Sequence, residues 1–405
     1  MKKFKLNKTA LLISSLLITN FACAEIYNDN DGIITGSGVI ADGGIYKIIS
    51  TSGEHNTISV ANNGSITVNA PAGTPIVHGN GELEGGDLLL ANGTIILVNS
   101  GTINLGSGST VYQIIGDYLP GSVVGRPDLA LDNDYNLVAA VNILELEGSS
   151  ASYLAQKGHI IADNLTINAS HTRDNKGIVS IYGEKNNGVF TLTGPTNVNT
   201  AANGANSDAF SIYAKEGTVI NAEDLVVNTQ GTHYTVGLLS EATQEDDRSL
   251  IRYQNATVTS IADTYADGIN ANGGDIEASG DTLVDITVNG EGGEASGIWL
   301  SDGYEGGNVA ASITNHGTTT LQVKSGADNT VLHGADSTGS SLFTANDLNI
   351  TLDAQGHQQV TGKGLYATKD AEAAPDNPGK IEVNGDLKID VIDSTRSGNW
   401  QFVHA

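Results

Sequence analysis

The sequence predicts an all-β chain folded as a right-handed parallel β-helix, a solenoid with coils of about 30 residues. Two series of apolar residues that recur with a similar spacing, together with a composition poor in helix-forming runs, support this prediction. One coil of short strands cannot bury its apolar side alone. Stacked coils, about 4.8 Å apart, hydrogen-bond each strand to its equivalents above and below.

The first series follows a pattern of a short polar residue, Leu, any residue, and then Ile or Val. It is clearest at residues 224–229 (DLVVNT) and returns at Asn164, Asp347 and Asp386. The second apolar positions of the pattern and of its weaker copies are Ile167, Val198, Val227, Val258, Val288, Val323, Ile350 and Ile389. Their spacing of 27 to 39 residues indicates a repeat whose variable length lies in loops.

The second series consists of apolar residues that mostly follow a small residue. Its members are Ile178, Phe210, Leu238, Ile269, Ile298, Leu332, Leu365 and Phe402, spaced by 28 to 37 residues. Each unit is therefore predicted to contain three strands, for example residues 177–183 (GIVSIYG), 217–222 (GTVINA) and 224–229.

The composition agrees with stacked strands and turns. The chain has 50 Gly and only one Met, with abundant Asn, Thr, Val and Ile. Because alternate strand residues face one side, we expect inward stacks that contain Leu165, Leu225, Leu348 and Leu387. A β-propeller would need four-stranded blades with hairpins, and a leucine-rich repeat would need denser Leu and a recurring Asn. Neither pattern is present.

The N-terminus has the features of a secretory signal peptide over residues 1–24. Lysines precede the apolar run LLISSLLI at 11–18, and Ala22 and Ala24 form the small-x-small pattern for cleavage before Glu25. Cleavage removes Cys23, the only cysteine, so the exported chain would form no disulfide. Lipidation of Cys23 is the alternative, but the residues before it lack the usual aliphatic side chain.

We divide the mature chain into less regular coils at 25–157 and regular repeats at 158–405 that end mid-repeat. Residues 57–70 resemble residues 94–107, and each copy predicts two strands joined by a hairpin or by a bend between solenoid faces. The long-range repetition favours the bend. Residues 118–136, with two of the seven prolines, are predicted to form a loop.

The formal net charge of −27 argues against nucleic-acid binding, which requires clustered Lys and Arg. We expect no cofactor and no metal ion. The nine histidines show no zinc-binding spacing, and no serine-hydrolase elbow occurs. The acidic segment 241–247 (EATQEDD) lacks a calcium-binding pattern, and Arg248 and Arg252 lie close enough to neutralise it, so we interpret it as a solvated loop.

A signal peptide followed by a Gly-, Asn-, Ser- and Thr-rich acidic solenoid with phrases such as NSGTINLGSG at 99–108 resembles the passenger of a pertactin-like type V autotransporter. The resemblance implies a pectin-lyase-like β-helix displayed on the cell surface through a C-terminal outer-membrane barrel. No barrel pattern follows the last repeat. We therefore expect a passenger that is a truncated copy or a partial sequence, on the surface if complete and periplasmic or secreted if not.

The function that the sequence favours is a non-enzymatic adhesin or surface-interaction scaffold. We expect a monomer whose edge loops bind a protein or glycan on a host or neighbouring cell, with the outer-membrane translocation machinery as a further partner if a barrel is encoded downstream. The alternative is a polysaccharide lyase or glycoside hydrolase, because such enzymes group carboxylates on one β-helix face. Asp281 with Asp285, or Asp302 with Glu305, are the candidate pairs.

Overall fold

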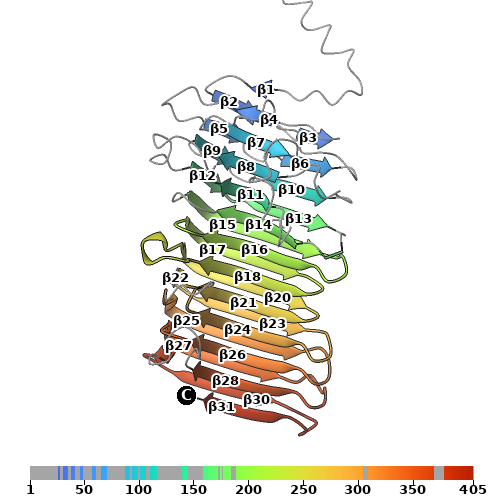
Figure 1. The fold of residues 1–405 in the computed structure, drawn as a ribbon, viewed down its shortest axis with the longest axis vertical. Coiled ribbons are helices and arrows are strands. Elements are labelled where there is room, and N and C mark those ends of the chain that lie inside the picture. Colours follow the sequence, from blue (N-terminus) through green and yellow to red (C-terminus); the bar gives the residue numbers. More distant parts are fainter. Residues whose placement is uncertain are drawn as a thin grey trace, which may run out of the picture.

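The chain forms a parallel β-helix in the computed structural model, with strands stacked as rungs along one long axis (Figure 1). The structure describes residues 158–171, 174–175, 177–183, 188–303, 309–368 and 378–404, together with the backbone of the strands between residues 26 and 144. The predicted cleavage site at Ala22, Ala24 and Glu25 and the predicted loop at 118–136 lie outside these residues. The predicted fold class is confirmed.

One face of the solenoid is a sheet that we call sheet A. Its strands, in their order along the stack, are β1 (Ile26–Tyr27), β4 (Tyr46–Ile48), β7 (Asp87–Ala91), β8 (Thr94–Val98), β11 (Ala139–Leu144), β14 (Gly177–Gly183), β16 (Asp208–Lys215), β18 (Tyr234–Glu241), β21 (Tyr265–Asn272), β24 (Glu294–Ser301), β26 (Val331–Thr338), β28 (Thr361–Thr368) and β31 (Asn399–His404).

The remaining strands form a second and a third face. The second face contains β2 (Asp31–Ile34), β5 (Thr57–Val60), β9 (Gly101–Leu105), β12 (Gly158–Asp163), β19 (Leu250–Tyr253), β22 (Asp275–Ala278) and β29 (Lys380–Val383). The third contains β3 (Gly38–Ala41), β6 (Ser65–Ala70), β10 (Thr110–Ile115), β13 (Thr166–His171), β20 (Asn255–Ala262), β23 (Thr282–Val288) and β30 (Leu387–Ile392). Four long strands bend across both faces: β15 (Val189–Ala202), β17 (Val219–Gln230), β25 (Ser312–Ser325) and β27 (Leu342–Asp353).

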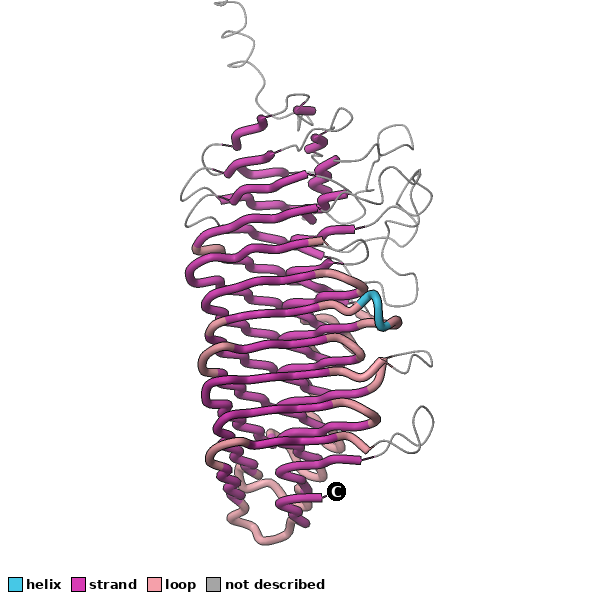
Figure 2. Tube along the Cα trace, turned by 90° about the vertical axis from the view of Figure 1, so that its left-hand side faces the viewer, coloured by secondary structure: helices cyan, strands magenta, loops and turns pink. Residues whose placement is uncertain are grey.

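Each regular coil therefore has three strand segments, as predicted, and these pair in parallel with their equivalents in the next coil. Figure 2 shows the rungs edge-on, with the short 3-10 helix η1 (Glu245–Asp247) beside the stack. The strand β7 differs, because it pairs antiparallel with both β4 and β8. The pair β5 and β6 lies on two different faces, so the bend that we predicted within residues 57–70 is confirmed.

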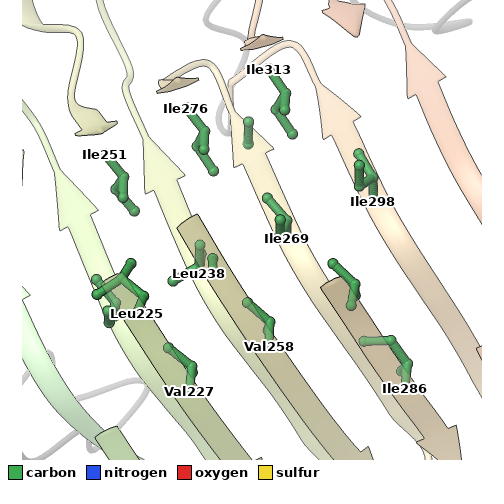
Figure 3. Packing of buried hydrophobic residues seen from close by; sticks show 14 of the residues in the cluster. Leu225, Val227, Leu238, Ile251, Val258, Ile269, Ile276, Ile286, Ile298 and Ile313 are labelled. Carbon is green, nitrogen blue, oxygen red and sulfur yellow. The ribbon is translucent and has the colours of Figure 1, made fainter. Parts of the chain in front are cut away.

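The core is the interior that the three faces enclose. Side chains of sheet A such as Leu238, of the second face such as Ile251, and of the third face such as Val227 point into one apolar interior (Figure 3). Each of these three side chains is almost fully buried. Burial against equivalent residues in neighbouring coils is the main favourable contribution to the stack.

The first predicted series is confirmed over most of its length. The register stacks Ile167, Val198, Val227, Val258, Val284, Leu321, Ile350 and Ile389 on the third face. The predicted members Val288 and Val323 are wrong by four and two positions, since Val284 and Leu321 occupy the stack instead. Both errors are even numbers, because a strand places every second residue on the same face and the apolar pattern cannot distinguish such shifts.

The second series is only partly in register. Leu238, Ile269 and Ile298 stack on one another as predicted, and Leu365 belongs to the same column. Ile178, Phe210, Leu332 and Phe402 do not, since this column contains Ile181, Ile212, Ala335 and Val403 at those coils.

A column of glycines explains why the side chains of sheet A do not alternate regularly between the inner and the outer face. Gly237, Gly268, Gly297, Gly334 and Gly364 occupy equivalent positions of sheet A. A Cβ atom at Gly268 would lie 2.7 Å from the carbonyl oxygen of Gly297 and 2.7 Å from Ile286 Cδ1 of the third face, so only glycine fits. The glycine and the aliphatic residue after it both face the core. The residues on either side of this pair therefore both face outward.

In two earlier coils, serine takes the place of this glycine. Ser180 and Ser211 are buried, and their hydroxyls hydrogen-bond to Thr200 and Thr229 of the third face. The Ser180 to Thr200 and Ser211 to Thr229 distances are both 2.6 Å. The interior is thus polar but satisfied there, as buried hydroxyls require.

The predicted Leu stack follows the same interior. Leu165, Leu225 and Leu348 are buried, whereas Leu387 is 45% exposed because it belongs to the last described strand of the third face. Val226 and Lys388, which lie between such inward positions, are exposed as predicted.

Candidate functional site

The outer face of sheet A contains columns of polar and aromatic side chains. Because of the glycine column, residues three apart on one strand point outward together. The column just before the glycines contains, in register order, Val236, Asp267, Ser296, His333 and Lys363. The column just after the Gly-aliphatic pairs contains Leu239, Asn270, Trp299, Asp336 and Tyr366. A third outer column contains Tyr234, Tyr265 and Glu294.

The charged, amide and aromatic members of these columns on β18, β21, β24, β26 and β28 form what we call the sheet A cluster. It comprises Tyr234, Tyr265, Asp267, Asn270, Glu294, Trp299, His333, Asp336, Lys363 and Tyr366. Its residues are separated by about thirty positions from coil to coil and become neighbours only through stacking.

Asp267 is the centre of one hydrogen-bond network in the cluster. Its Oδ2 atom accepts hydrogen bonds from Tyr234 Oη at 2.8 Å and from Asn270 Nδ2 at 2.9 Å. Asn270 Nδ2 also donates to Tyr234 Oη at 3.1 Å. The pKa of Asp267 is raised to about 6, mainly by burial and also by the nearby charge of Glu294. The two hydrogen bonds and the electrostatic interaction with His333 lower the pKa and offset part of this rise.

His333 is the centre of a second network. Its Nδ1 atom lies 3.0 Å from Asp336 Oδ2, and its Nε2 atom lies 4.0 Å from Glu294 Oε1. The imidazole packs edge-on against Tyr366, and Lys363 Nζ lies 3.3 Å from the centre of the same Tyr366 ring. The cluster thus already holds one cation against an aromatic face.

Two buried oxygen atoms of the cluster have no hydrogen-bond donor. They are Asn270 Oδ1 and Asp336 Oδ1. Burying an unpaired acceptor costs about 1–3 kcal/mol, more for a charged group. Both atoms are shielded from solvent, so each is a local cost to the fold within the cluster.

The predicted pair Asp281 and Asp285 is not brought together as a site, because each side chain has a structural partner. Asp281 Oδ1 accepts a hydrogen bond from the Thr318 backbone N–H at 2.9 Å. Asp285 pairs with Lys324 Nζ at 2.6 Å on the outside of the third face.

Asp281 belongs to a corner column between the second and third faces, which also contains Asp224, Asn255 and Asp347. Asn255 Nδ2 donates to Asp224 Oδ1, and the Asp386 backbone N–H donates to Asp347 Oδ1, each at 2.8 Å. The recurring Asp or Asn of the repeat thus connects successive coils at a turn.

Of the second predicted pair, Glu305 lies outside the described residues. Asp302 is buried and holds the turn of the next coil. Its carboxylate accepts hydrogen bonds from the Ser340 backbone N–H at 2.8 Å and from Ser341 Oγ at 3.0 Å. These contacts give Asp302 a structural role.

The acidic segment 241–247 is only partly a solvated loop. Glu241 is buried and accepts a hydrogen bond from Tyr213 Oη at 2.8 Å, whereas η1 contains no buried residue. Arg248 pairs with Glu245, as expected, and also with Asp275, to which its Nε donates at 2.8 Å. The expected neutralisation by Arg252 is wrong, because Arg252 pairs with Glu277 on the second face.

Three of the described histidines have acidic partners. His233 pairs with Asp208, His333 with Asp336, and His357 with Asp328. Within the described part of the chain, no group of three or more His, Cys, Asp or Glu side chains is arranged to hold a metal ion.

Sequence reasoning missed the sheet A cluster. The signal that identifies it is the Gly-aliphatic pair itself, as in Gly268-Ile269 and Gly297-Ile298, because the residues immediately before and after each pair are the outward ones. Reading those flanking positions coil by coil gives the two columns directly.

Comparisons with protein-family models, with curated proteins and with solved structures find no significant match to this chain. No segment of the described residues forms a helix of the length and apolarity needed to span a lipid bilayer.

Proposed function

We propose that the chain is the exported passenger of a pertactin-like autotransporter and acts as a non-enzymatic adhesin or surface-interaction scaffold. The lysine-rich N-terminus, the apolar run at 11–18 and the cleavage pattern at Ala22 and Ala24 support export. The parallel β-helix is the fold that such passengers have, and it agrees with the proposal.

The observation that carries the proposal is the sheet A cluster on a regular strand scaffold. A solenoid whose coils are hydrogen-bonded to both neighbours is stiff, so side chains on its outer face keep their relative positions. Tyr265 is 46% exposed and the Glu294 side chain is 44% exposed, and both lie in register on adjacent strands of sheet A. A ligand-binding surface has this combination of accessible and preorganised groups.

The partner we propose is a molecule on a host or neighbouring cell, bound by a monomeric chain at the cell surface. Nucleic acid is a poor partner for a chain with a net charge of −27. Binding would take place on the strand face of β18 to β28, in contrast to the edge loops that the sequence suggested.

Polysaccharide cleavage is the second candidate function. Asp267, Glu294 and His333 lie in adjacent outer columns, and carboxylates grouped on one face are what acid–base cleavage of a glycan needs. This alternative assigns the reaction to the sheet A cluster and leaves Asp281 and Asp302 in structural roles.

The test is to display the chain on a non-adherent bacterium and to measure adhesion to host cells and to bacterial cells, with product release from a panel of acidic polysaccharides in parallel. We expect adhesion without product release. Product release that Glu294→Gln abolishes would replace the adhesin by the enzyme, and the absence of both activities would refute the proposed function.

A further inference from the structure

We infer that Asn203 is a site of spontaneous deamidation, at which the side-chain amide is converted to the carboxylate of aspartate or isoaspartate. The site lies in the turn between β15 and β16, at the corner of the third face and sheet A. The inference goes beyond the proposed function and does not depend on it.

The reaction needs only the chain and water. The backbone nitrogen of Gly204 attacks the side-chain carbonyl carbon of Asn203, a C–N bond forms, and the side-chain nitrogen leaves as ammonia with the proton that the attacking nitrogen loses. Water then opens the cyclic imide at either carbonyl group, which gives aspartate or isoaspartate. A following glycine favours the attack because no Cβ atom lies beside its nitrogen.

Four asparagines of the described residues precede a glycine, and the fold holds them differently. They are Asn203, Asn272, Asn289 and Asn384. Asn272 is 2% exposed, and its Oδ1 atom accepts a hydrogen bond from Ser301 Oγ at 2.8 Å. The other three asparagines are exposed, so water reaches them.

A hydrogen bond on the glycine nitrogen distinguishes the three exposed pairs. The Gly290 N–H donates to the carbonyl oxygen of Asp263 at 2.9 Å, and the Gly385 N–H donates to that of Asn346 at 2.7 Å. Among the described residues, no carbonyl group accepts from the Gly204 N–H. A hydrogen-bonded nitrogen must lose its acceptor in the neighbouring coil before it can attack, so attack is easiest at Gly204.

Asn289 is a matched comparison for Asn203, because both occupy the same position in their coils. Asn203 follows Ala201 by two residues and Asn289 follows Thr287 by two residues, and the register stacks Ala201 and Thr287 in one column of the third face. The two sites therefore share a corner of the solenoid and differ in the hydrogen bond of the glycine.

The rest of the turn is held in place, so the new carboxylate has a defined effect. The Ala205 N–H donates to Asp174 Oδ1 at 2.7 Å, and the Ser207 N–H donates to Thr232 Oγ1 at 2.9 Å. A carboxylate at position 203 adds a negative charge two residues from the amide that Asp174 holds, and isoaspartate also lengthens the backbone. Both changes loosen the turn.

The test is incubation of the purified full chain at neutral pH, followed over time by mass spectrometry of the peptides that contain Asn203, Asn289 and Asn384. Enzymatic methylation identifies isoaspartate, and digestion in water enriched in heavy oxygen marks any product that forms during handling. In the folded chain, we expect Asn203 to convert about fivefold faster than Asn289 and Asn384, because the glycine nitrogens of those two pairs must first lose a hydrogen bond.

The chain unfolded in denaturant is the reference for the effect of local sequence. Unfolding releases all three glycine nitrogens, so we expect the advantage of Asn203 to disappear. Equal rates at Asn203 and Asn289 in the folded chain would overturn the inference. A folded chain in which Asn203 does not react, although the unfolded chain does, would overturn it as well.

Two variants separate the reaction from its effect on the turn. Asn203→Gln should abolish acid formation at this position and leave the rate at Asn289 unchanged, because the longer side chain forms the cyclic imide much more slowly. Asn203→Asp has the charge of the product, so hydrogen exchange of the Ala205 and Ser207 amides should be faster than in the Asn203→Gln chain. Equal exchange in the two variants would contradict the loosened turn.

Discussion

His333 and Asp336 hydrogen-bond on the outer face of β26, with 3.0 Å between His333 Nδ1 and Asp336 Oδ2. Residues three apart on a regular strand lie on opposite faces. Here Gly334 and Ala335 both face the core, so the side chains before and after them meet outside. The same geometry joins Asp267 to Asn270 on β21 and Lys363 to Tyr366 on β28. The glycine column thus creates the surface that we propose binds a ligand.

Substituting Gly334 should disturb both the stack and this surface. A Cβ atom there would lie 2.7 Å from Ile350 Cγ2 and would also meet the Gly364 carbonyl oxygen. We expect Gly334→Ala to cost about 1–3 kcal/mol in unfolding free energy, as overpacking does. Chemical denaturation measures the cost, and NMR of the His333 ring reports the local change.

The control for this substitution is Gly292→Ala. Gly292 has a φ of +76° and no atom within 4 Å of an added Cβ, so it tests backbone strain alone, at about 1 kcal/mol. A Gly334→Ala chain as stable as the unsubstituted one would contradict the close-packing account of the column.

The loss of unfolding free energy on truncating a leucine to alanine should depend on the position of that leucine in its column. Leu348 is fully buried and Leu387, its register partner in the next coil, is 45% exposed. We expect Leu348→Ala to cost about 2–5 kcal/mol and Leu387→Ala clearly less, because the exposed leucine buries less surface and leaves no closed cavity. Denaturant unfolding of both variants tests this, and equal costs would argue against the described stack.

Asp267 should make stability depend on pH in a defined direction. Its pKa rises from 3.8 to about 6 on folding, so the folded chain binds this proton more tightly than the unfolded chain does. The contribution of Asp267 to the unfolding free energy is therefore highest below its ordinary pKa and decreases as the pH rises to about 6. Asp267→Asn should remove this decrease, and thermal unfolding from pH 4 to pH 8 measures it relative to Asp285→Asn. Parallel pH profiles of the two variants would contradict the assignment.

Asp281 should act as a hydrogen-bond acceptor and not as an acid. Asn can still accept from the Thr318 N–H, whereas Ala cannot. We expect Asp281→Asn to preserve slow hydrogen exchange of the Thr318 amide and Asp281→Ala to accelerate it, with a loss of about 1 kcal/mol. Faster exchange in both variants would indicate that the negative charge itself is needed.

The fold was predictable from the sequence because stacked coils repeat their apolar positions. Ile167, Val198, Val227 and Val258 were identified correctly, since each follows the same short pattern. Val288 was misplaced because β23 contains three inward apolar residues at alternate positions, and periodicity alone does not select one of them.

The site was not predictable in the same way. Its residues change identity from coil to coil, as Asp267, Ser296 and His333 do in one column, so no repeat reveals them. The carboxylates that the sequence did suggest, Asp281 and Asp302, accept hydrogen bonds from backbone N–H groups of the next coil, so they hold turns of successive coils together.

The most direct test of the account compares two displayed variants in one adhesion assay. One combines Tyr265→Ala with Glu294→Gln on the sheet A cluster, and the other replaces the exposed acids Glu245, Asp246 and Asp247 of η1 by Ser. The account predicts that the cluster variant loses adhesion while the η1 variant adheres like the unsubstituted chain. Adhesion that survives in the cluster variant and disappears in the η1 variant would contradict it.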